Sequence, residues 1–255
     1  MHTPEVVAHR GYALCYPENT LVGVKAAIDA GARYIEVDIQ LTADGLPVLF
    51  HDRTLERVCG GQGAIHEKSA KQLLKLHASE PARFERRFAK EPIATLKDFC
   101  ELLARHPEVT AFVEIKRIAI ERFGGGEVFS AVTKVLEPVI AKCVLISFSI
   151  GFLEIVRRQR PATAIGAVVD SWEQSRSPEI RTMRPDYLFC GVDGLPASGL
   201  LHPPLGAKLV VYEVADGVLA LKLAERGVDF VETFACAEML TYLRTLARSP
   251  QKRVV

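Results

Sequence analysis

Short apolar runs alternate with longer amphipathic segments along this chain, and that alternation constrains the fold more than any other feature. The apolar runs are rich in β-branched residues, which is typical of strands. The strand candidates are residues 6–9, 34–39, 47–51, 110–116, 144–148, 164–169, 186–189, 208–214 and 229–232. The helix candidates are residues 19–30, 95–106, 127–141, 150–159, 216–226 and 236–248. Strands that alternate with helices predict βαβ units and a parallel sheet.

One pair of strand candidates does not fit a parallel arrangement. Only residues 41–46 separate the second candidate from the third, whereas a parallel crossover needs about a dozen residues or more. Asp44 followed by Gly45 is a strong turn signal. We therefore expect residues 34–51 to form a β-hairpin, which brings Asp38 opposite Phe50 and His51. The eight strands that remain predict an α/β fold of the (β/α)8 TIM barrel class.

The stretch between the hairpin and the next helix breaks the alternation. It contains a glycine-rich segment, residues 59–63, and charged segments at 70–77 and 83–90. A loop of this length without structure of its own is unusual inside a barrel. We therefore predict that residues 52–94 form a small insertion or cap over one mouth of a single barrel domain spanning residues 1–255.

Charge and cysteine content narrow the classes of function. Lys and Arg number 32 and Asp and Glu number 31, so a net charge of +1 excludes a role driven by whole-chain charge toward nucleic acid or membranes. No apolar run is long enough for a membrane span, and residues 1–10 lack the pattern of a secretory signal. The six cysteines are scattered without a CxxC pair, which favours reduced thiols and a cytoplasmic location.

Acidic residues occur where a barrel would place its chemistry, at the carboxyl ends of the strands. Glu36 and Asp38 are two residues apart on one strand and so share a face. If that face is the interior, their like charges need a cation or a shared proton. Glu114 would supply a third oxygen, and such a set favours Mg²⁺ or Ca²⁺ over zinc. Two alternatives to a metal site stay open. In one, Glu36 and Asp38 face solvent, and in the other, Glu114 simply pairs with a Lys or Arg.

Two cations lie close to these carboxylates in the sequence. Lys116 shares a face with Glu114, so it would either bind a phosphate oxygen or neutralise that carboxylate. The guanidinium of Arg10 matches two phosphate oxygens, although an ion pair with Asp52 is the alternative.

His9 and His51 end two of the strand candidates and would suit a general acid and a general base, because histidine titrates near neutral pH. A structural role is the alternative for each. Glycines 124–126 precede a helix but lack the ending of a P-loop, so a hinge is the favoured role over a phosphate cradle. The other histidines lie in loop-like or helical contexts without a carboxylate pair: His2, His66, His77, His106 and His202.

Several motifs occur together and in order over residues 6–148. They are His-Arg-Gly at 9–11, Pro-Glu-Asn-Thr at 17–20, Gly-Ala at 31–32, Ile-Glu-Val-Asp at 35–38, Thr-Ala-Asp-Gly at 42–45, Val-Leu-Phe-His-Asp at 48–52, Arg-Thr-Leu-Glu-Arg at 53–57, Gly-Gln-Gly at 61–63, Ile-Ala-Thr-Leu at 93–96, Glu-Ile-Lys at 114–116 and Ser-Phe at 147–148. With these motifs the chain resembles the glycerophosphodiester phosphodiesterase family.

The resemblance implies a (β/α)8 barrel that hydrolyses glycerophosphodiesters to glycerol phosphate and an alcohol, in lipid and glycerol metabolism. It implies one divalent cation, Mg²⁺ or Ca²⁺, and a small-molecule substrate, with a homodimer left open. The implied roles are metal binding by Glu36, Asp38 and Glu114, acid/base catalysis by His9 and His51, and phosphate binding by Arg10 and Lys116. The alternatives are a related barrel phosphodiesterase or phospholipase that stops at a cyclic product, and a barrel that binds a phosphorylated ligand without turnover.

The last third of the chain departs from the family pattern. Tyr-Glu-Val-Ala at 212–215 stands where the family usually has Trp-Thr-Val-Asn, and residues 227–234 replace a run that usually ends in Thr-Asp. These strand ends would line the alcohol side of the pocket, so the headgroup preference stays open. Glu213 would either attract a cationic headgroup or point outward toward a helix, and the outward position is slightly favoured.

Overall fold

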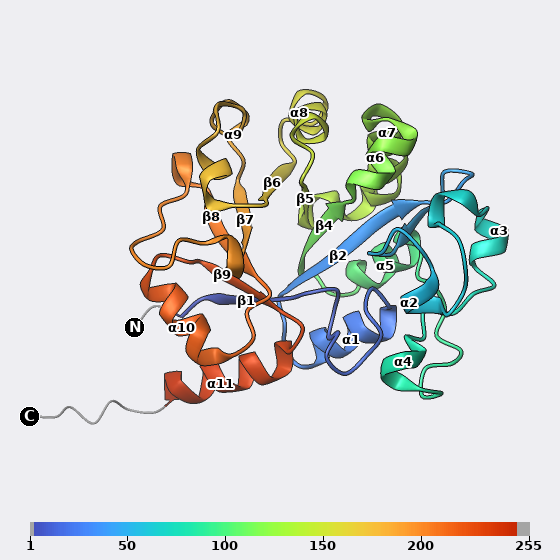
Figure 1. Cartoon of the computed structure of the whole chain (residues 1–255), viewed down its shortest axis with the longest axis horizontal. Helices are drawn as coiled ribbons and strands as arrows, with labels where there is room; N and C mark the ends of the chain where they lie inside the picture. Colours follow the sequence, from blue (N-terminus) through green and yellow to red (C-terminus); the bar gives the residue numbers. More distant parts are fainter. Residues whose placement is uncertain (1–2, 249–255) are drawn as a thin grey trace, which may run out of the picture.

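Eight parallel strands close into a barrel in the computed structural model, which describes residues 3–248 (Figure 1). In order around the barrel they are β1 (Glu5–Ala8), β2 (Tyr34–Leu41), β4 (Thr110–Ile115), β5 (Cys143–Ser147), β6 (Ala164–Val169), β7 (Tyr187–Gly191), β8 (Lys208–Tyr212) and β9 (Phe230–Thr233). The barrel closes because β1 pairs in parallel with both β2 and β9. The predicted TIM barrel is confirmed.

Helices surround the barrel, and each of the six predicted ones is present. The longer helices are α1 (Leu21–Asp29), α5 (Leu96–Ala104), α6 (Arg117–Phe123), α7 (Gly125–Leu136), α8 (Ile150–Gln159), α9 (Pro178–Met183), α10 (Gly217–Glu225) and α11 (Cys236–Arg248). The backbone continues past α7 as the 3-10 helix η2 (Glu137–Lys142), which has Pro138 in its first turn. Two helices, α6 and α9, were not predicted, because each is short and begins soon after the element before it. Gly124 joins α6 to α7 with a φ of 82°, in line with a hinge.

The predicted hairpin is also confirmed. Strand β3 (Pro47–Leu49) runs antiparallel to β2, with Ile39 opposite Leu49. The turn uses Gly45 at a φ of 80°, and the hydroxyl of Thr42 accepts a hydrogen bond from the backbone N–H of Leu46. Past the strand, the N–H of Phe50 donates to the carbonyl of Asp38 at 2.9 Å. The hairpin thus holds the residues before His51 against the strand that carries the paired acids.

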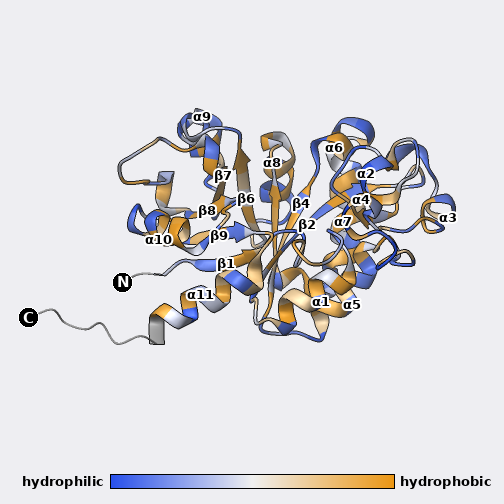
Figure 2. Cartoon of the chain, turned by 60° about the horizontal axis from the view of Figure 1, so that its bottom comes forward, coloured by the Kyte–Doolittle hydropathy of each residue, from blue (hydrophilic) through white to orange (hydrophobic). Residues whose placement is uncertain are grey.

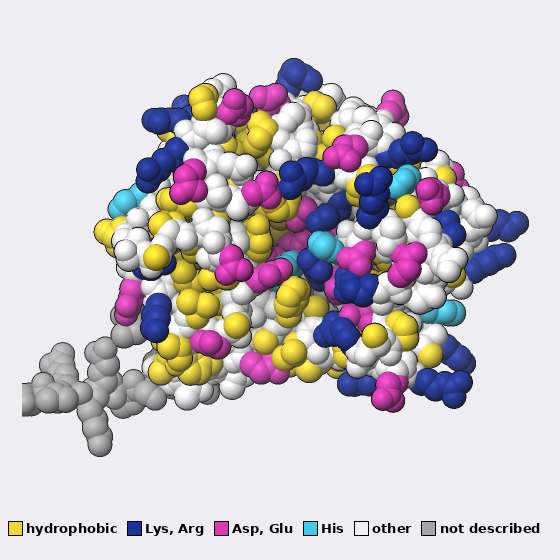
Figure 3. All heavy atoms as spheres, viewed as in Figure 1, with side chains coloured by type: hydrophobic (Ala, Val, Ile, Leu, Met, Phe, Trp, Pro, Cys, Tyr) yellow, Lys and Arg dark blue, Asp and Glu magenta, His cyan; other side chains and the backbone are white. Residues whose placement is uncertain are grey.

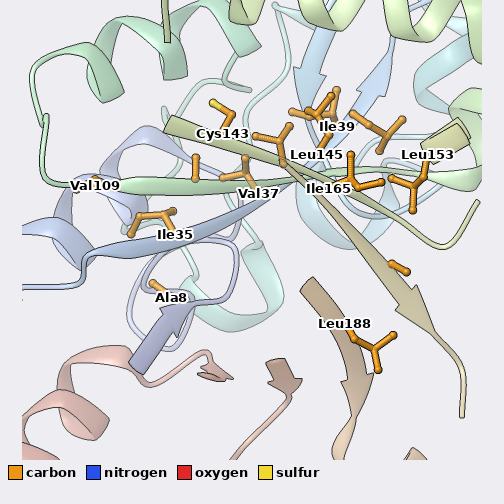
Figure 4. Packing of buried hydrophobic residues seen from close by; sticks show 14 of the residues in the cluster. Ala8, Ile35, Val37, Ile39, Val109, Cys143, Leu145, Leu153, Ile165 and Leu188 are labelled. Atoms are coloured by element: carbon orange, nitrogen blue, oxygen red, sulfur yellow. The ribbon is translucent and has the colours of Figure 1, made fainter. Parts of the chain in front are cut away.

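The strand residues divide into two apolar layers, because alternate side chains point to opposite faces. One set packs between the barrel and its helices, and Figure 4 shows Ile35, Val37 and Ile39 of β2 in this layer. The helices present hydrophobic strips toward it (Figure 2). The other set fills the barrel interior and consists of Val7, Phe112, Val144, Ile146, Val168, Phe189, Val210 and Phe230. Each fully buried side chain of this kind contributes about 1.5–3 kcal/mol to folding.

Residues 52–94 contain short helices, namely α2 (Glu56–Cys59), η1 (Ile65–Glu67), α3 (Ala70–Leu73) and α4 (Pro81–Phe84). In Figure 1 α2, α3 and α4 lie to one side of the barrel, beside the carboxyl end of β2. Their apolar residues form a cluster with the hairpin arm, which contains Val48, Phe50, Leu55, Val58, Ile65, Leu73, Ala78 and Ile93. The segment therefore has a small core of its own. Among the helices of residues 3–248, none has the length and apolar character that a bilayer crossing requires.

Candidate active site

A cavity of about 120 Å³ opens at the carboxyl end of the barrel. Its lining is His9, Arg10, Glu36, His51, Glu114, Lys116, Ile146, Phe148, Val168, Phe189, Tyr212, Glu213 and Glu232. Figure 3 shows a hollow in this face with acidic side chains inside it and basic and histidine side chains beside it. A larger groove, of about 460 Å³, is lined by residues of α10 and α11 but gathers no comparable set of acids, bases and imidazoles. We therefore take the smaller cavity as the candidate active site.

Strand periodicity places the paired acids inside the barrel. Glu36 and Asp38 lie on the face of β2 opposite to Ile35, Val37 and Ile39, and they are only 2% and 1% exposed. The solvent-facing alternative for this pair is therefore wrong.

Glu114 joins the paired acids because it lies in register with Asp38 on the neighbouring strand. Glu36, Asp38 and Glu114 each offer an oxygen within 4.8 Å of the others.

Asp38 is surrounded by donors. Arg10 Nε lies 3.2 Å from its Oδ2, Lys116 Nζ lies 3.2 Å from its Oδ1, and the side-chain amide of Asn19 donates to Oδ2 at 2.8 Å. Burial alone would raise the pKa of this carboxyl, but the charges of Lys116 and Arg10 hold the pKa well below its usual range. Asp38 is therefore a carboxylate near neutral pH.

Three other buried acids, Glu36, Glu114 and Glu232, have the opposite shift. Burial, followed by the charges of neighbouring carboxylates, raises the pKa of Glu36 and Glu232 above the ordinary range. Burial also raises the pKa of Glu114, although the charge of Lys116 opposes the shift. The backbone N–H of Arg10 donates to Glu36 Oε2 at 3.1 Å, but Glu36 Oε1 is buried and has no hydrogen-bond partner among residues 3–248. An all-oxygen donor set with unpaired buried oxygens fits a hard divalent cation.

Lys116 pairs with Glu114, one of the two roles expected for it, and its binding of a phosphate oxygen stays a prediction. Its Nζ lies 2.8 Å from Glu114 Oε1, so it pairs with that carboxylate as the alternative for Glu114 proposed, and it also lines the cavity. Burial would lower the pKa of Lys116, but Asp38 and Glu114 outweigh burial and raise it. The ammonium group therefore stays charged beside the acids.

His9 is a buried imidazole at the end of β1. Its ring stacks on Phe234, with 4.5 Å between ring centroids, and its Nε2 lies 3.9 Å from carboxylate oxygens of both Glu36 and Glu232. Burial, followed by the positive charge of Arg10, lowers the pKa of His9 well below the usual value. The ring is therefore neutral near pH 7 and able to accept a proton.

His51 is held from two sides. Its Nδ1 lies 2.9 Å from Asp52 Oδ1, which leaves Nε2 as the nitrogen available to a ligand. The side-chain amide of Gln40 donates to the backbone carbonyls of Phe50, His51 and Asp52 at 3.1, 3.1 and 2.6 Å. Gln40 is buried on β2, so the strand with the paired acids also positions the backbone around His51.

Arg57 connects the insertion to both sides of the site. Its guanidinium donates to the two oxygens of Asp52 at 2.6 and 2.7 Å and to the two oxygens of Glu18 at 2.9 and 2.7 Å. Glu18 also accepts from Arg10 Nη1 at 3.3 Å. The proposed pairing of Arg10 with Asp52 does not occur among these contacts, because Asp52 pairs with Arg57. No role was predicted for Glu18 or Arg57, because no local pattern relates a loop residue to a residue of the short helix α2.

The remaining wall of the cavity comes from the late strands and is aromatic and acidic. Gly191 leaves room for the ring of Tyr212, since a Cβ at that glycine would meet the ring at 3.0 Å. Glu213 is exposed and lines the cavity with a φ of 62°, so the expectation that it points away from the pocket is wrong. Glu232 belongs to the run 227–234 that was expected to line the pocket, but it was not predicted as a site residue. The alternation along β9, in which Phe230 points inward, is the signal that would have found it.

Six of the seven predicted site residues line one cavity, and the seventh, Asp38, lies against Arg10 and Lys116 of that lining. Comparison with known proteins identifies the family. The family model described as the glycerophosphoryl diester phosphodiesterase family matches residues 9–205. The chain belongs to this family. The resemblance given by the motifs is confirmed, and with it the expectation of a chain from an enzyme family. The match ends before β8, so Tyr212, Glu213 and Glu232 lie outside it.

Individual relatives agree with the family model. A glycerophosphodiester phosphodiesterase of Caldanaerobacter subterraneus subsp. tengcongensis is 32% identical over 188 residues, covering 71% of this chain and 75% of that protein. Glycerophosphodiester phosphodiesterase 1 of Mus musculus is 38% identical over 110 residues, which are 43% of this chain and 33% of the mouse protein. The match thus spans about a third of the mouse relative's length.

The fold recurs in solved structures. A phosphodiesterase of Oleispira antarctica, solved with the product sn-glycerol-3-phosphate, superimposes with a TM-score of 0.83 and 25% identity over 95% of this chain and 97% of that one. A glycerophosphodiester phosphodiesterase of Agrobacterium tumefaciens has a TM-score of 0.75 at 21% identity, over 93% of this chain and 99% of its own. The barrel is therefore common to members of low sequence identity.

Proposed function

We propose that this chain is a metal-dependent phosphodiesterase that hydrolyses glycerophosphodiesters to glycerol phosphate and an alcohol. The observation that carries the proposal is the convergence of two imidazoles, two cations and three carboxylates on one cavity. The product bound to the Oleispira antarctica relative supports glycerol phosphate as the product here. We also propose that residues 1–255 form one barrel domain in which residues 52–94 are an insertion.

Glu36, Asp38 and Glu114 would hold one divalent cation, Mg²⁺ or Ca²⁺. When bound, such a cation offsets the charge that develops on the phosphate and lowers the pKa of a hydroxyl group. Arg10 and Lys116 already lie against Asp38, and they would bind the non-bridging phosphate oxygens beside the acids. Together these groups would orient the phosphorus between the two histidines.

The surroundings of the two imidazoles suit opposite roles. Neutral His9 would take the proton of the attacking glycerol hydroxyl. His51 would protonate the leaving alcohol, because Asp52 can accept the Nδ1 hydrogen of the positively charged ring. Attack by the hydroxyl forms a cyclic phosphate, which water then opens while the two histidines exchange roles. The products are glycerol phosphate and the alcohol.

The cellular setting forms part of the same proposal. All six cysteines are free, which suits the reducing cytoplasm, and the proposed substrates belong to lipid and glycerol metabolism. A homodimer stays a prediction that light scattering of the purified chain will test.

The test is an activity screen across several glycerophosphodiesters with Mg²⁺ or Ca²⁺, and with EDTA as the metal-free arm. His9→Ala and His51→Ala should each lower kcat by roughly 10²–10⁴-fold. His106→Ala is the matched control, because the His106 ring pairs with the exposed Glu108 and is not part of the cavity lining. Full turnover in both site variants would contradict the assignment. Phosphorus NMR that shows a cyclic end product would favour a lyase, and ligand-induced thermal stabilisation without product would favour a binding protein.

A further inference from the structure

Among the described residues that line the cavity, Glu232 is the one buried carboxylate to which the proposed mechanism assigns no role. It lies on the interior face of β9 and is 2% exposed. Its Oε1 has no hydrogen-bond partner among the described residues, although the atom is fully buried. A buried carboxylate oxygen without a donor is costly, and proteins retain such groups where a ligand satisfies them.

The position of Glu232 relates it to the predicted cation ligands. Glu232, Glu36 and His9 offer ligand atoms that all lie within 4.8 Å of one another. Glu36 also belongs to the set formed with Asp38 and Glu114. Glu36 is therefore common to both groups, and Glu232 extends the acidic cluster from β2 and β4 across to β9.

The positively charged side chains of the site lie beside Asp38 and Glu114 rather than beside Glu36 and Glu232. Arg10 and Lys116 lie against Asp38, and Lys116 also pairs with Glu114. The only hydrogen bond that the carboxylate of Glu36 accepts among the described residues comes from the backbone N–H of Arg10. Neither Glu36 nor Glu232 has a lysine or arginine side-chain nitrogen within 4.0 Å among the described residues, and each has an unpartnered buried oxygen. Two adjacent carboxylates without a counter-charge match the charge of one divalent cation.

We propose that Glu232 is a fourth carboxylate ligand of the cation that Glu36, Asp38 and Glu114 bind. The inference rests on the proposed function only in that it concerns the same cation site. Ca²⁺ accepts six to eight oxygen ligands in flexible arrangements, whereas Mg²⁺ is usually held by one or two carboxylates and keeps several waters. Four carboxylates thus suit Ca²⁺ better, and Ca²⁺ is the probe for the test.

Calorimetric titration of the metal-free protein with Ca²⁺ tests the proposal without any substrate. The wild-type chain should bind one Ca²⁺, and Glu232→Gln, which keeps the shape of the side chain, should weaken that binding by about 10–100-fold or more. Glu213→Gln is the matched control, because Glu213 lines the same cavity but is exposed. Its affinity for Ca²⁺ should change by less than about threefold. Melting curves in EDTA establish that both variants are folded.

A crystal structure of the wild-type protein with Ca²⁺ provides a second test that requires no variant. One oxygen of Glu232 should lie about 2.3–2.6 Å from the ion. Unchanged Ca²⁺ affinity in Glu232→Gln, equal losses in both variants, or a Glu232 remote from the bound ion would overturn the proposal. Ca²⁺ binding through Glu232 by a chain that cleaves no glycerophosphodiester would instead refute the proposed function and leave this ligand role intact.

Discussion

His51 and Asp52 are neighbours in the chain whose side chains also contact each other, with 2.9 Å between Nδ1 and Oδ1. Side chains of adjacent residues seldom meet when the backbone is extended, because they point to opposite faces. Here the backbone leaves β3 after Leu49, and the side-chain amide of Gln40 donates to the backbone carbonyls of His51 and Asp52. The contact determines which ring nitrogen of His51 is free, and the first prediction follows from it.

Asp52→Asn should lower kcat by roughly 10²-fold or more, because an amide cannot supply the negative charge that stabilises a protonated imidazole. The measurement is the steady-state hydrolysis of a glycerophosphodiester. Asp29→Asn is the control, since Asp29 forms an exposed ion pair with Lys25 on α1. A kcat equal to that of the wild type would show that Asp52 does not act on His51.

Arg57→Lys should lower kcat and raise KM, each by about tenfold, because an ammonium group cannot bind Asp52 and Glu18 in the paired geometry of a guanidinium. The kcat loss would come through Asp52 and His51, and the KM increase through Glu18 and Arg10. Arg53→Lys, at an exposed position of the same insertion, should leave both constants unchanged. An effect on melting temperature alone would mean that Arg57 is only structural.

Divalent cations should raise the melting temperature of the wild-type chain, since a ligand at 100 times its Kd stabilises the folded state by about 2.7 kcal/mol. Glu36→Gln should abolish this increase, because Glu36 contributes to both groups of candidate ligands. In EDTA the same variant should melt at or above the wild-type temperature, since it removes a buried carboxylate that lacks a counter-charge. Thermal unfolding with and without Ca²⁺ measures both effects. Equal cation-induced shifts in the two proteins would exclude Glu36 as a ligand.

Acid should destabilise the protein partly through Asp52. Burial would raise the pKa of Asp52, but its hydrogen bonds with His51 and Arg57 lower it well below the ordinary value of about 3.9. A carboxyl with a lowered pKa in the folded state contributes stability above its unfolded pKa, and that stability is lost as the pH falls further. Denaturant unfolding in EDTA below about pH 4 should therefore show a shallower decline for Asp52→Asn than for the wild type. Parallel declines would contradict the shift.

Five of the six thiols should react slowly with a thiol reagent at pH 8. Burial raises the pKa of Cys59, Cys143 and Cys236 to about 12, and that of Cys100 and Cys190 to about 11. The reactive thiolate is therefore scarce at pH 8 in the folded protein. All six should react promptly in denaturant, and Cys15→Ser should remove any fast native phase. Rapid labelling of two or more native thiols would disagree with this burial.

The barrel and the early half of the site were predictable from the sequence because their signals are local. A six-residue turn segment with Asp44 and Gly45 predicts the hairpin, and the spacing of Glu36 and Asp38 predicts their shared face. The orientation of Glu232 also has a local signal, but its proximity to Glu36 depends on β9 pairing with β1, where Glu232 lies opposite Val7. That pairing closes the barrel between the two ends of the chain.

The link from Arg57 to Glu18 had no signal in the sequence. The two residues are 39 positions apart, and both lie outside the barrel strands. Their contact depends on the packing of the insertion, in which the carboxylate of Glu80 accepts a hydrogen bond from the backbone N–H of Glu18 at 2.6 Å. Contacts of this kind arise from tertiary packing rather than from periodicity.

The two walls of the cavity come from different parts of the chain. The hairpin and its neighbours provide the imidazoles and most of the charge, whereas Phe189, Tyr212 and Glu213 come from strands more than a hundred residues later. Substitutions of Phe189, Tyr212 or Glu213 would change this wall of the cavity without removing Asp52 or Gln40, which hydrogen-bond to His51. Under the proposed function, selection for a new alcohol can therefore act on these late residues while the two histidines and the hairpin that holds His51 are inherited unchanged.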